Sequence, residues 1–278
     1  PLWDKNMVVS FHKYWNNNDD GSIKGFLEYR EKYNVQLWLG ETGENSNAWF
    51  TDAIRLFERN NIGWCMWPLK KAGYNNPLQV KLNDGYRKIV DYWKGNGPQP
   101  SADEAFRSLM ELAAGSNTRS NIVHHDVTDA MIRQVNDALP APYRNNLLQS
   151  GTVIFASDYD MGRSGIAYHD KDSADYWSLT QVRTPGNTGG QYRNDGVDIE
   201  SSHDNISNGY SVGWIQDGEW LQYSLYAPEE GIYDIHIRAA APSAGGQLQL
   251  ILNNEFTGSA LDIPATGGWY QWQTGTIK

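Results

Sequence analysis

VQLWLGE at residues 35–41 is the middle one of three short apolar runs, between MVVSFHKYW at 7–15 and IGWCMWP at 62–68. All three are rich in β-branched and aromatic residues, which predicts buried strands. Three amphipathic stretches with apolar residues at helical spacing alternate with these runs, at 23–34, 48–61 and 84–95. Repeats of a strand and a helix are typical of parallel α/β folds, above all the (β/α)8 barrel. We therefore expect a partial TIM barrel made of the last three of its eight units.

The rest of the chain has a different character. Residues 103–146 carry apolar residues at helical spacing, which predicts a helical extension. From Gly151 on, short alternating runs are separated by clusters of Gly, Asn, Pro and Asp, which predicts an antiparallel β-sandwich of the jelly-roll type. We expect three parts: part of a barrel at 1–97, a helical extension or linker at 98–150, and a sandwich at 151–278. Since neither outer part is complete, we expect the chain to be a fragment.

Composition narrows the possible partners. The formal net charge is −10, and residues 151–278 hold 16 acidic and six basic side chains, so a nucleic acid is not expected as a partner. The single cysteine, Cys65, excludes an intrachain disulfide and a cysteine-based zinc site. No apolar run is long enough to span a membrane. Twelve Trp and 16 Tyr against seven Phe favour a flat surface that binds sugars or peptides.

Chemically reactive or aromatic side chains stand at the ends of the three predicted strands. His12 and Tyr14 are two residues apart and so share a face, Glu41 ends the second strand, and Trp67 ends the third. Because active sites of (β/α)8 barrels lie at the carboxyl ends of the strands, these residues should meet at one mouth. A retaining glycosidase needs a carboxylate nucleophile and groups that orient it. The alternative is an aromatic-rich core with a capping Glu.

The stretches FHKYW, LWLGETGENSNAWF and NIGWCMWPLKK resemble the C-terminal part of a glycoside hydrolase family 5 enzyme of the endoglucanase type. The resemblance covers about residues 3–95. It implies that Glu41 is the nucleophile, that His12 and Tyr14 assist it, and that Trp67 forms a platform for a sugar ring. The family's acid/base, a Glu of an Asn-Glu pair on the fourth strand, has no counterpart in this sequence. We therefore expect this chain alone to be inactive.

The second half resembles a carbohydrate-binding module of family 6, in stretches such as NTGGQYRNDGVDIE at 187–200, VGWIQDGEWLQY at 212–223 and PATGGWYQW at 264–272. Such modules hold a glycan between two aromatic rings. The resemblance implies that Trp269 and Trp214 are these rings and that Gln216 and Asp217 bind hydroxyl groups. An exposed Trp in a Gly-Gly-Trp turn supports ligand contact for Trp269 without any resemblance. The alternative is that Trp214 and Trp220 both belong to the sandwich core.

A metal ion is a further possibility. Relatives of the module often bind structural calcium through a pair of Glu residues, whose positions are taken here by Phe155 and Ser157. Four aspartates could supply oxygen ligands instead, so calcium is possible near Asp158 and Asp160, with Asp170 and Asp172 as further donors. A solvated acidic surface is the alternative. The run His124-His125-Asp126 is expected to be a polar helix face, because adjacent side chains on a helix diverge.

These observations predict a fragment of a secreted or cell-surface bacterial protein that degrades polysaccharides. The parent is expected to be a retaining endo-β-1,4-glucanase of the cellulase type that needs no cofactor for catalysis. Its expected partner is a β-glucan or a related plant-type polysaccharide, and the chain is expected to be monomeric. The alternative is a non-catalytic carbohydrate-binding protein. The sequence does not distinguish cellulose from mixed-linkage glucan, xyloglucan, mannan or xylan.

Overall fold

The computed structural model describes residue 4, residues 6–172, residue 174 and residues 187–277. The chain divides into two compact units. Unit 1 comprises residues 1–144, 156–200 and 212–224, and unit 2 comprises residues 145–155, 201–211 and 225–278. Unit 1 thus combines the predicted barrel segment and most of the helical extension with two segments of the predicted sandwich. The boundaries expected near residues 97 and 150 stay a prediction.

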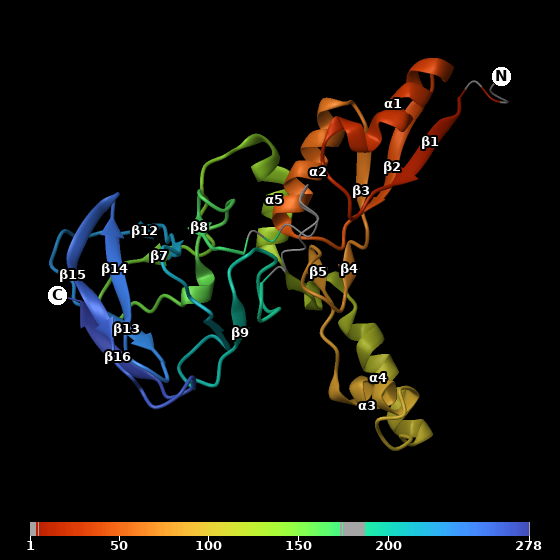
Figure 1. Ribbon diagram of the computed structural model, residues 1–278. Helices are drawn as coiled ribbons and strands as arrows, with labels where there is room; N and C mark the ends of the chain where they lie inside the picture. The colour runs from red at the N-terminus through yellow and green to blue at the C-terminus, as the bar shows by residue number, and fades with distance from the viewer. Residues whose placement is uncertain (1–3, 5, 173, 175–186, 278) are drawn as a thin grey trace. The chain divides into compact units, whose positions relative to one another are not determined.

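Unit 1 is built on a parallel sheet of three strands in the order β1 (Val8–His12), β2 (Gln36–Thr42) and β3 (Gly63–Met66). Helices α1 (Asp20–Tyr33) and α2 (Asn47–Arg59) follow β1 and β2, as the apolar spacing predicts (Figure 1). Along β2, Leu37 and Leu39 are buried while Trp38 between them is exposed, because side chains alternate between the two faces of a strand. One face of the sheet is therefore covered by helices.

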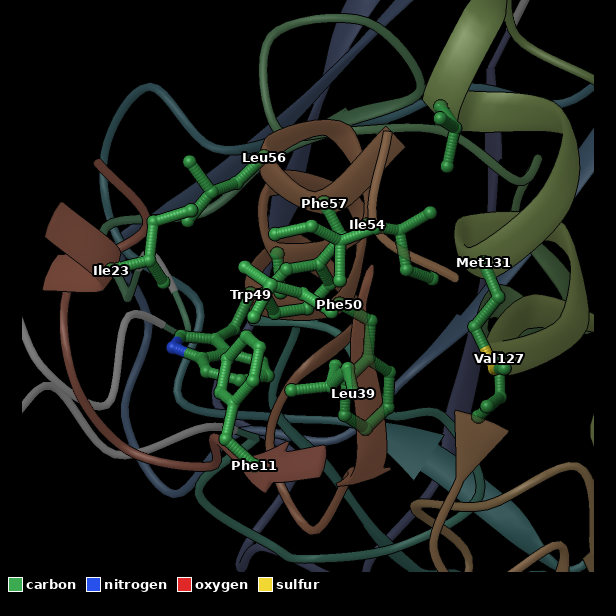
Figure 2. Close-up of a cluster of buried hydrophobic side chains, with 14 residues drawn as sticks. Phe11, Ile23, Leu39, Trp49, Phe50, Ile54, Leu56, Phe57, Val127 and Met131 are labelled. Carbon is green, nitrogen blue, oxygen red and sulfur yellow. The ribbon is translucent and has the colours of Figure 1, made fainter. Parts of the chain in front are cut away.

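The core of unit 1 lies between this face of the sheet and the helices (Figure 2). Helix α2 contributes more to it than any other element, with six apolar residues that are buried: Trp49, Phe50, Ala53, Ile54, Leu56 and Phe57. Ser46 starts this helix, since its side-chain oxygen accepts a hydrogen bond from the Trp49 N–H at 3.2 Å. Helix α5 (His125–Asn136) contributes Val127 and Met131 to the same core. Part of the predicted extension thus packs in the same core as the three-stranded sheet.

The stretch predicted to be helical at 103–146 is interrupted. Helix α4 (Ala102–Gly115) is followed by a 3-10 turn at Thr118–Ser120 and the short strand β6 (Ile122–Val123) before α5 begins. Asn117 accepts a hydrogen bond from the Arg119 N–H and so favours the turn over the helix. The other short elements of this region are α3 (Asp84–Trp93), β4 (Lys70–Lys71) and β5 (Leu78–Gln79).

The second half of the chain contains short strands. In unit 1, β8 (Tyr168–His169) pairs with β11 (Trp220–Leu221). Strand β9 (Ile199–Ser201) pairs with β10 (Tyr210–Val212), and each of these two strands includes residues assigned to both units. In unit 2, β13 (Ile235–Ala239) pairs with β16 (Gln273–Ile277), and β14 (Gly246–Leu252) pairs with β15 (Glu255–Ile263), both antiparallel. Strands β7 (Asn146–Leu147) and β12 (Leu225–Tyr226) form a parallel pair.

These pairs do not join into two continuous sheets within the described residues, so the sandwich stays a prediction, as does the barrel. The run at 152–156, which the alternating pattern predicts to be a strand, is irregular up to the 3-10 turn at Ala156–Asp158. In unit 2, the hairpin β14–β15 turns at Asn253 and Asn254, whose φ angles of 51° and 68° suit a tight two-residue turn. Among the described residues, none of the helices has the length and apolar character needed to cross a membrane.

Candidate functional site

The structure brings His12, Tyr14 and Glu41 together at the carboxyl ends of β1 and β2. His12 and Glu41 are partners in the register of the parallel pair. The Tyr14 hydroxyl donates a hydrogen bond to Glu41 Oε2 at 2.7 Å, and His12 Nδ1 lies 3.3 Å from the same oxygen. Both contacts involve Oε2, which leaves Oε1 as the oxygen that could attack an electrophile. The Glu41 side chain is 31% exposed, so a ligand can reach it.

The protonation of Tyr14 follows from its surroundings. Burial raises the pKa of the Tyr14 hydroxyl, and the hydrogen bond to Glu41 and the nearby negative charges of Glu41 and Glu44 raise it further. Tyr14 therefore stays protonated at neutral pH and acts as a hydrogen-bond donor. A donor fixed on one carboxylate oxygen restricts the rotation of the Glu41 side chain, which orients the other oxygen.

Trp67 stands beside the loop that follows Glu41. The Trp67 backbone N–H donates to the Thr42 carbonyl oxygen at 2.7 Å, and the peptide bond from Trp67 to Pro68 is cis. The approach is so close that a Cβ atom on Gly43 would lie 2.0 Å from the Trp67 carbonyl oxygen, so only glycine fits there. The Trp67 side chain is 53% exposed, as a sugar platform requires, and Trp15, next to Tyr14, is 44% exposed. The sequence prediction did not include Trp15.

Glu44, three residues after Glu41, is the nearest further carboxylate in the same loop. Its Oε1 lies 3.3 Å from Lys71 Nζ, so its charge is paired. The Glu44 backbone is in the left-handed region, with φ at 51°. A retaining glycosidase needs its general acid on the other side of the scissile bond from the nucleophile, and a residue three positions along the same loop does not provide this.

A second lysine, Lys13, lies between His12 and Tyr14 in the sequence. It is buried, and it is not among the candidate site residues predicted from the sequence. Its ammonium group donates to the carbonyl oxygens of Asn16 at 3.1 Å and Asn17 at 2.8 Å, and it lies 4.8 Å from the Trp49 ring centre. Burial lowers the pKa of Lys13 to about 8, although Asp19 opposes this shift. Alternation along the strand could have indicated that Lys13 points away from the face of His12 and Tyr14.

The run at residues 124–126 is not the polar surface that the sequence predicts. His124 and Asp126 are 4% and 1% exposed. His124 Nε2 lies 2.8 Å from Gln79 Oε1, and burial lowers the pKa of the imidazole. Asp126 accepts hydrogen bonds from the Asn47 side chain at 2.8 Å and from the Asn194 N–H at 2.9 Å. These residues serve internal contacts of unit 1, and nothing in the local sequence pattern signals their burial.

Of the four aspartates expected near calcium, Asp158 and Asp160 bind protein groups, whereas Asp170 and Asp172 belong to a cluster of carboxylates. The Asp160 carboxylate accepts bonds from the Ser224 N–H at 2.9 Å and hydroxyl at 2.7 Å, and Asp158 lies 3.3 Å from Arg144. Protein donors thus already surround both side chains. Among the described residues, one carboxylate oxygen from each of Asp170, Asp172 and Asp198 lies within 4.8 Å of the other two.

This carboxylate cluster has the donor chemistry that calcium prefers. Burial raises the pKa of Asp170 to about 6, and the charges of Glu219, Asp198 and Asp172 add to the rise. Burial also raises the pKa of Asp198. The fit is partial, because the Asp170 and Asp198 carboxylates also accept hydrogen bonds from the N–H groups of Asp172 at 2.8 Å and Thr188 at 2.6 Å.

Three predicted glycan contacts lie in unit 1. Trp214 is 51% exposed and has a φ angle of 50°, a backbone conformation that is uncommon for a bulky residue. Gln216 accepts a hydrogen bond from Lys171 Nζ at 3.1 Å, and Asp217 is exposed. Trp220 is 39% exposed, so the alternative in which Trp214 and Trp220 are both core residues does not agree with the structure.

Trp269 lies in unit 2, where the loop before β16 presents it. Thr266 ties this loop to Ala241, since its N–H donates to the Ala241 carbonyl oxygen at 2.8 Å and its hydroxyl accepts from the Ala241 N–H at 2.9 Å. Gly267 has a φ angle of 99°, which a residue without a side chain adopts readily. Trp269 is 68% exposed and Tyr270 46%, so the turn offers aromatic surface to a ligand.

Comparison with known proteins gives one family for the second half. The model of the family described as Carbohydrate binding module (family 6) matches residues 190–278. This match supports a carbohydrate-binding module in that part of the chain, and it supports glycan binding. The Clotting factor G alpha subunit of Tachypleus tridentatus is 38% identical over 80 residues, which are 28% of this chain and 12% of that protein. The aligned region thus spans about an eighth of the relative.

Proposed function

We propose that this chain is part of a modular protein that binds a polysaccharide outside the cell and cleaves it. In this proposal, residues 190–278 bind the glycan through exposed aromatic side chains. Residues 1–97 carry the nucleophile half of a retaining glycosidase site of the endo-β-1,4-glucanase type. The family match supports the first function. The single observation that supports the second is the convergence of Tyr14 and His12 on one oxygen of Glu41.

The proposed reaction follows from this geometry. Glu41 Oε1 would form a bond to the anomeric carbon of a bound glycan while the bond from that carbon to the leaving oxygen breaks. Tyr14 keeps its proton and holds Oε2, so that Oε1 carries the attack. Trp67 would stack on the sugar ring. A second carboxylic acid would give its proton to the leaving oxygen in such a mechanism, and Glu44 does not suit this role because it follows Glu41 by three residues in the same loop.

A closed barrel is part of this proposal. The face of the sheet opposite the helices carries Val8 and Trp38, which are 56% and 41% exposed. In a (β/α)8 barrel such a face is covered by side chains from the other strands. His12 shares this face with Val8, since the two residues are four positions apart on β1. The proposal also includes calcium, which Asp170, Asp172 and Asp198 would hold as a structural ion.

The nucleophile can be tested without a general acid. We suggest incubation of the chain with 2,4-dinitrophenyl 2-deoxy-2-fluoro-β-cellobioside. Its dinitrophenolate leaves with the bonding electron pair and needs no proton, so the reagent reports on the nucleophile alone. The expected result is one added fluorocellobiosyl group, located on Glu41 by peptide mass spectrometry.

Two variants complete this test. Glu41→Gln should abolish labelling, whereas Glu111→Gln, which removes an exposed carboxylate on α4, should leave it unchanged. Labelling at another residue, or no labelling of the unmodified chain, would contradict the catalytic part of the proposal. A chain that binds glycans but is never labelled would be a non-catalytic carbohydrate-binding protein. The family match alone favours this second candidate.

A further inference from the structure

The loop between Glu41 and helix α2 is held by a residue from a distant part of unit 1. Asn194 Nδ2 donates hydrogen bonds to the Asn45 carbonyl oxygen at 2.8 Å and to Asn47 Oδ1 at 3.1 Å. The Asn47 N–H in turn donates to the Asn194 carbonyl oxygen at 3.0 Å. Three hydrogen bonds therefore join one asparagine to the segment that leads from the candidate nucleophile into α2.

The same loop fixes the backbone of Tyr14. Asn45 is fully buried, and its Nδ2 donates to the Tyr14 carbonyl oxygen at 2.7 Å. The Tyr14 hydroxyl then donates to Glu41. Hydrogen bonds thus link Asn194 to Asn45, Asn45 to Tyr14, and Tyr14 to the candidate nucleophile. Each of these residues lies in unit 1.

Asn194 is itself held rigidly by buried charges. Its N–H donates to Asp126 Oδ2 at 2.9 Å, and its neighbour Asp195 lies 3.0 Å from Arg193 Nη2. Arg193 is fully buried and also donates to the Tyr159 carbonyl oxygen at 2.7 Å. Buried polar groups of this kind are costly to leave unpaired, so they favour one arrangement of the segment around residue 194.

We infer that Asn194 is a positioning residue of the candidate active site. It sets the loop after Glu41 and, through Asn45, the place of the Tyr14 hydroxyl. This inference rests on the proposed catalytic function. It also means that the part of the chain that matches the carbohydrate-binding family supplies support to a site formed by residues 12–67. Removal of the Asn194 side chain should therefore slow the attack by Glu41, although no group that touches the substrate is changed.

The test compares Asn194→Ala with Asn205→Ala in the full chain. Asn205 is an exposed asparagine that is not part of the hydrogen bonds linking Asn194 to Glu41. Labelling by the fluorocellobioside gives three quantities: the rate constant of the covalent step, the dissociation constant of the reagent, and the final labelled fraction. For Asn194→Ala we expect a rate constant about five- to tenfold lower, with an unchanged dissociation constant and a complete final fraction. Asn205→Ala should match the unmodified chain.

The final labelled fraction distinguishes an effect on positioning from an effect on folding. Partial unfolding lowers the number of molecules that react, but the folded molecules still react at the original rate. A loss of final fraction at an unchanged rate constant would overturn the inference, as would no change at all. Asn45→Ala should slow the reaction to a similar degree, and the double variant should be no slower than either single one.

Hydrogen exchange gives a second measurement that does not depend on labelling. The amides of residues 42–47 should exchange several-fold faster in Asn194→Ala than in Asn205→Ala. If the unmodified chain is not labelled, the proposed catalytic function fails. The contact between Asn194 and the loop is then judged by exchange alone, and equal exchange in the two variants overturns it.

Discussion

Tyr14 and His12 approach the same oxygen of Glu41, and the two contacts can be separated by substitution. Tyr14→Phe removes only the hydroxyl that lies 2.7 Å from Oε2. A hydrogen bond to a charged group contributes about 1.5–3 kcal/mol. We therefore expect labelling of Glu41 to slow by about ten- to a hundredfold, with little change in the melting temperature.

The matched control is Tyr29→Phe, because Tyr29 is an exposed tyrosine on helix α1 whose ring packs against Tyr33. Its labelling rate should equal that of the unmodified chain. If Tyr14→Phe reacts as fast as the control, Tyr14 does not orient the nucleophile. In that case His12 would be the remaining group that holds Glu41 Oε2.

Asp170 gives a pH dependence with a defined sign. Its pKa is about 6 in the folded chain, against 3.8 for an aspartate that is free in water, so the folded state holds the proton more tightly. The contribution of Asp170 to the free energy of unfolding is fully present below about pH 3.8 and is lost as the pH rises through about 6. Asp170→Asn keeps an acceptor for the Asp172 N–H but cannot ionise. It should therefore be more stable than the unmodified chain at pH 7, by about 1–2 kcal/mol.

Thermal unfolding between pH 4 and pH 8 measures this effect. The advantage of Asp170→Asn should grow with pH, whereas Asp234→Asn, at an exposed position, should show no such trend. Calcium should reduce the advantage, because a bound cation would stabilise the ionised Asp170 of the unmodified chain. A constant difference at every pH would show that Asp170 does not titrate in this range.

At the same scale, the sequence predicted the residues whose positions follow from strand geometry. His12, Tyr14 and Glu41 stand at strand ends, and the two-residue period of a strand together with parallel pairing brings them to one edge. Asn45 and Asn194 could not be found in this way. Asparagine is common in turns and loops, so its occurrence there carries no signal of a buried contact 149 residues away.

Helix α2 supplies more residues to the core of unit 1 than any other element. Its sequence alternates apolar and polar residues with a helical period, and the predicted range of 48–61 differs by only one or two residues from Asn47–Arg59. The prediction of one helical region at 103–146 was less accurate, because short local turns such as Thr118–Ser120 do not disturb the apolar spacing. The helical period of apolar residues therefore predicted where helices pack better than it predicted where they end.

The buried charges that join α2, α5 and the segment around residue 193 give a prediction at this scale. Arg193→Met removes the positive charge beside Asp195 and Asp126, of which Asp195 lies at 3.0 Å. Removal of one partner from a buried ion pair costs about 3–5 kcal/mol, because the remaining charge is left unpaired. Denaturant unfolding followed by tryptophan fluorescence should show a loss of this size.

Arg107→Met is the control for this experiment, since Arg107 is exposed on α4. Its unfolding free energy should change by less than about 0.5 kcal/mol. If Arg193→Met is no less stable than this control, the buried cluster contributes nothing to unit 1. The inference that Asn194 is held rigidly would then lose its physical basis.

At the scale of the whole molecule, the chain combines two kinds of sequence that differ in composition. The acidic second half, rich in Gly and aromatic residues, contains the match to the carbohydrate-binding family at residues 190–278. The compact units nevertheless do not follow this division, since residues 156–200 and 212–224 belong to unit 1. Buried polar contacts, such as that of Asn194 with the Asn45 carbonyl oxygen, join distant segments within unit 1, and periodicity does not report them.

Glycan binding by the second half is the central claim, and calorimetric titration of the full chain with cello- and xylo-oligosaccharides tests it most directly. Trp269→Ala removes an aromatic side chain that is 68% exposed, and Trp93→Ala, at 66%, is its control on helix α3. We predict binding by the unmodified chain and by Trp93→Ala, and affinity at least about tenfold weaker for Trp269→Ala. Equal affinities in all three proteins, or no binding of either oligosaccharide by the unmodified chain, would contradict this claim.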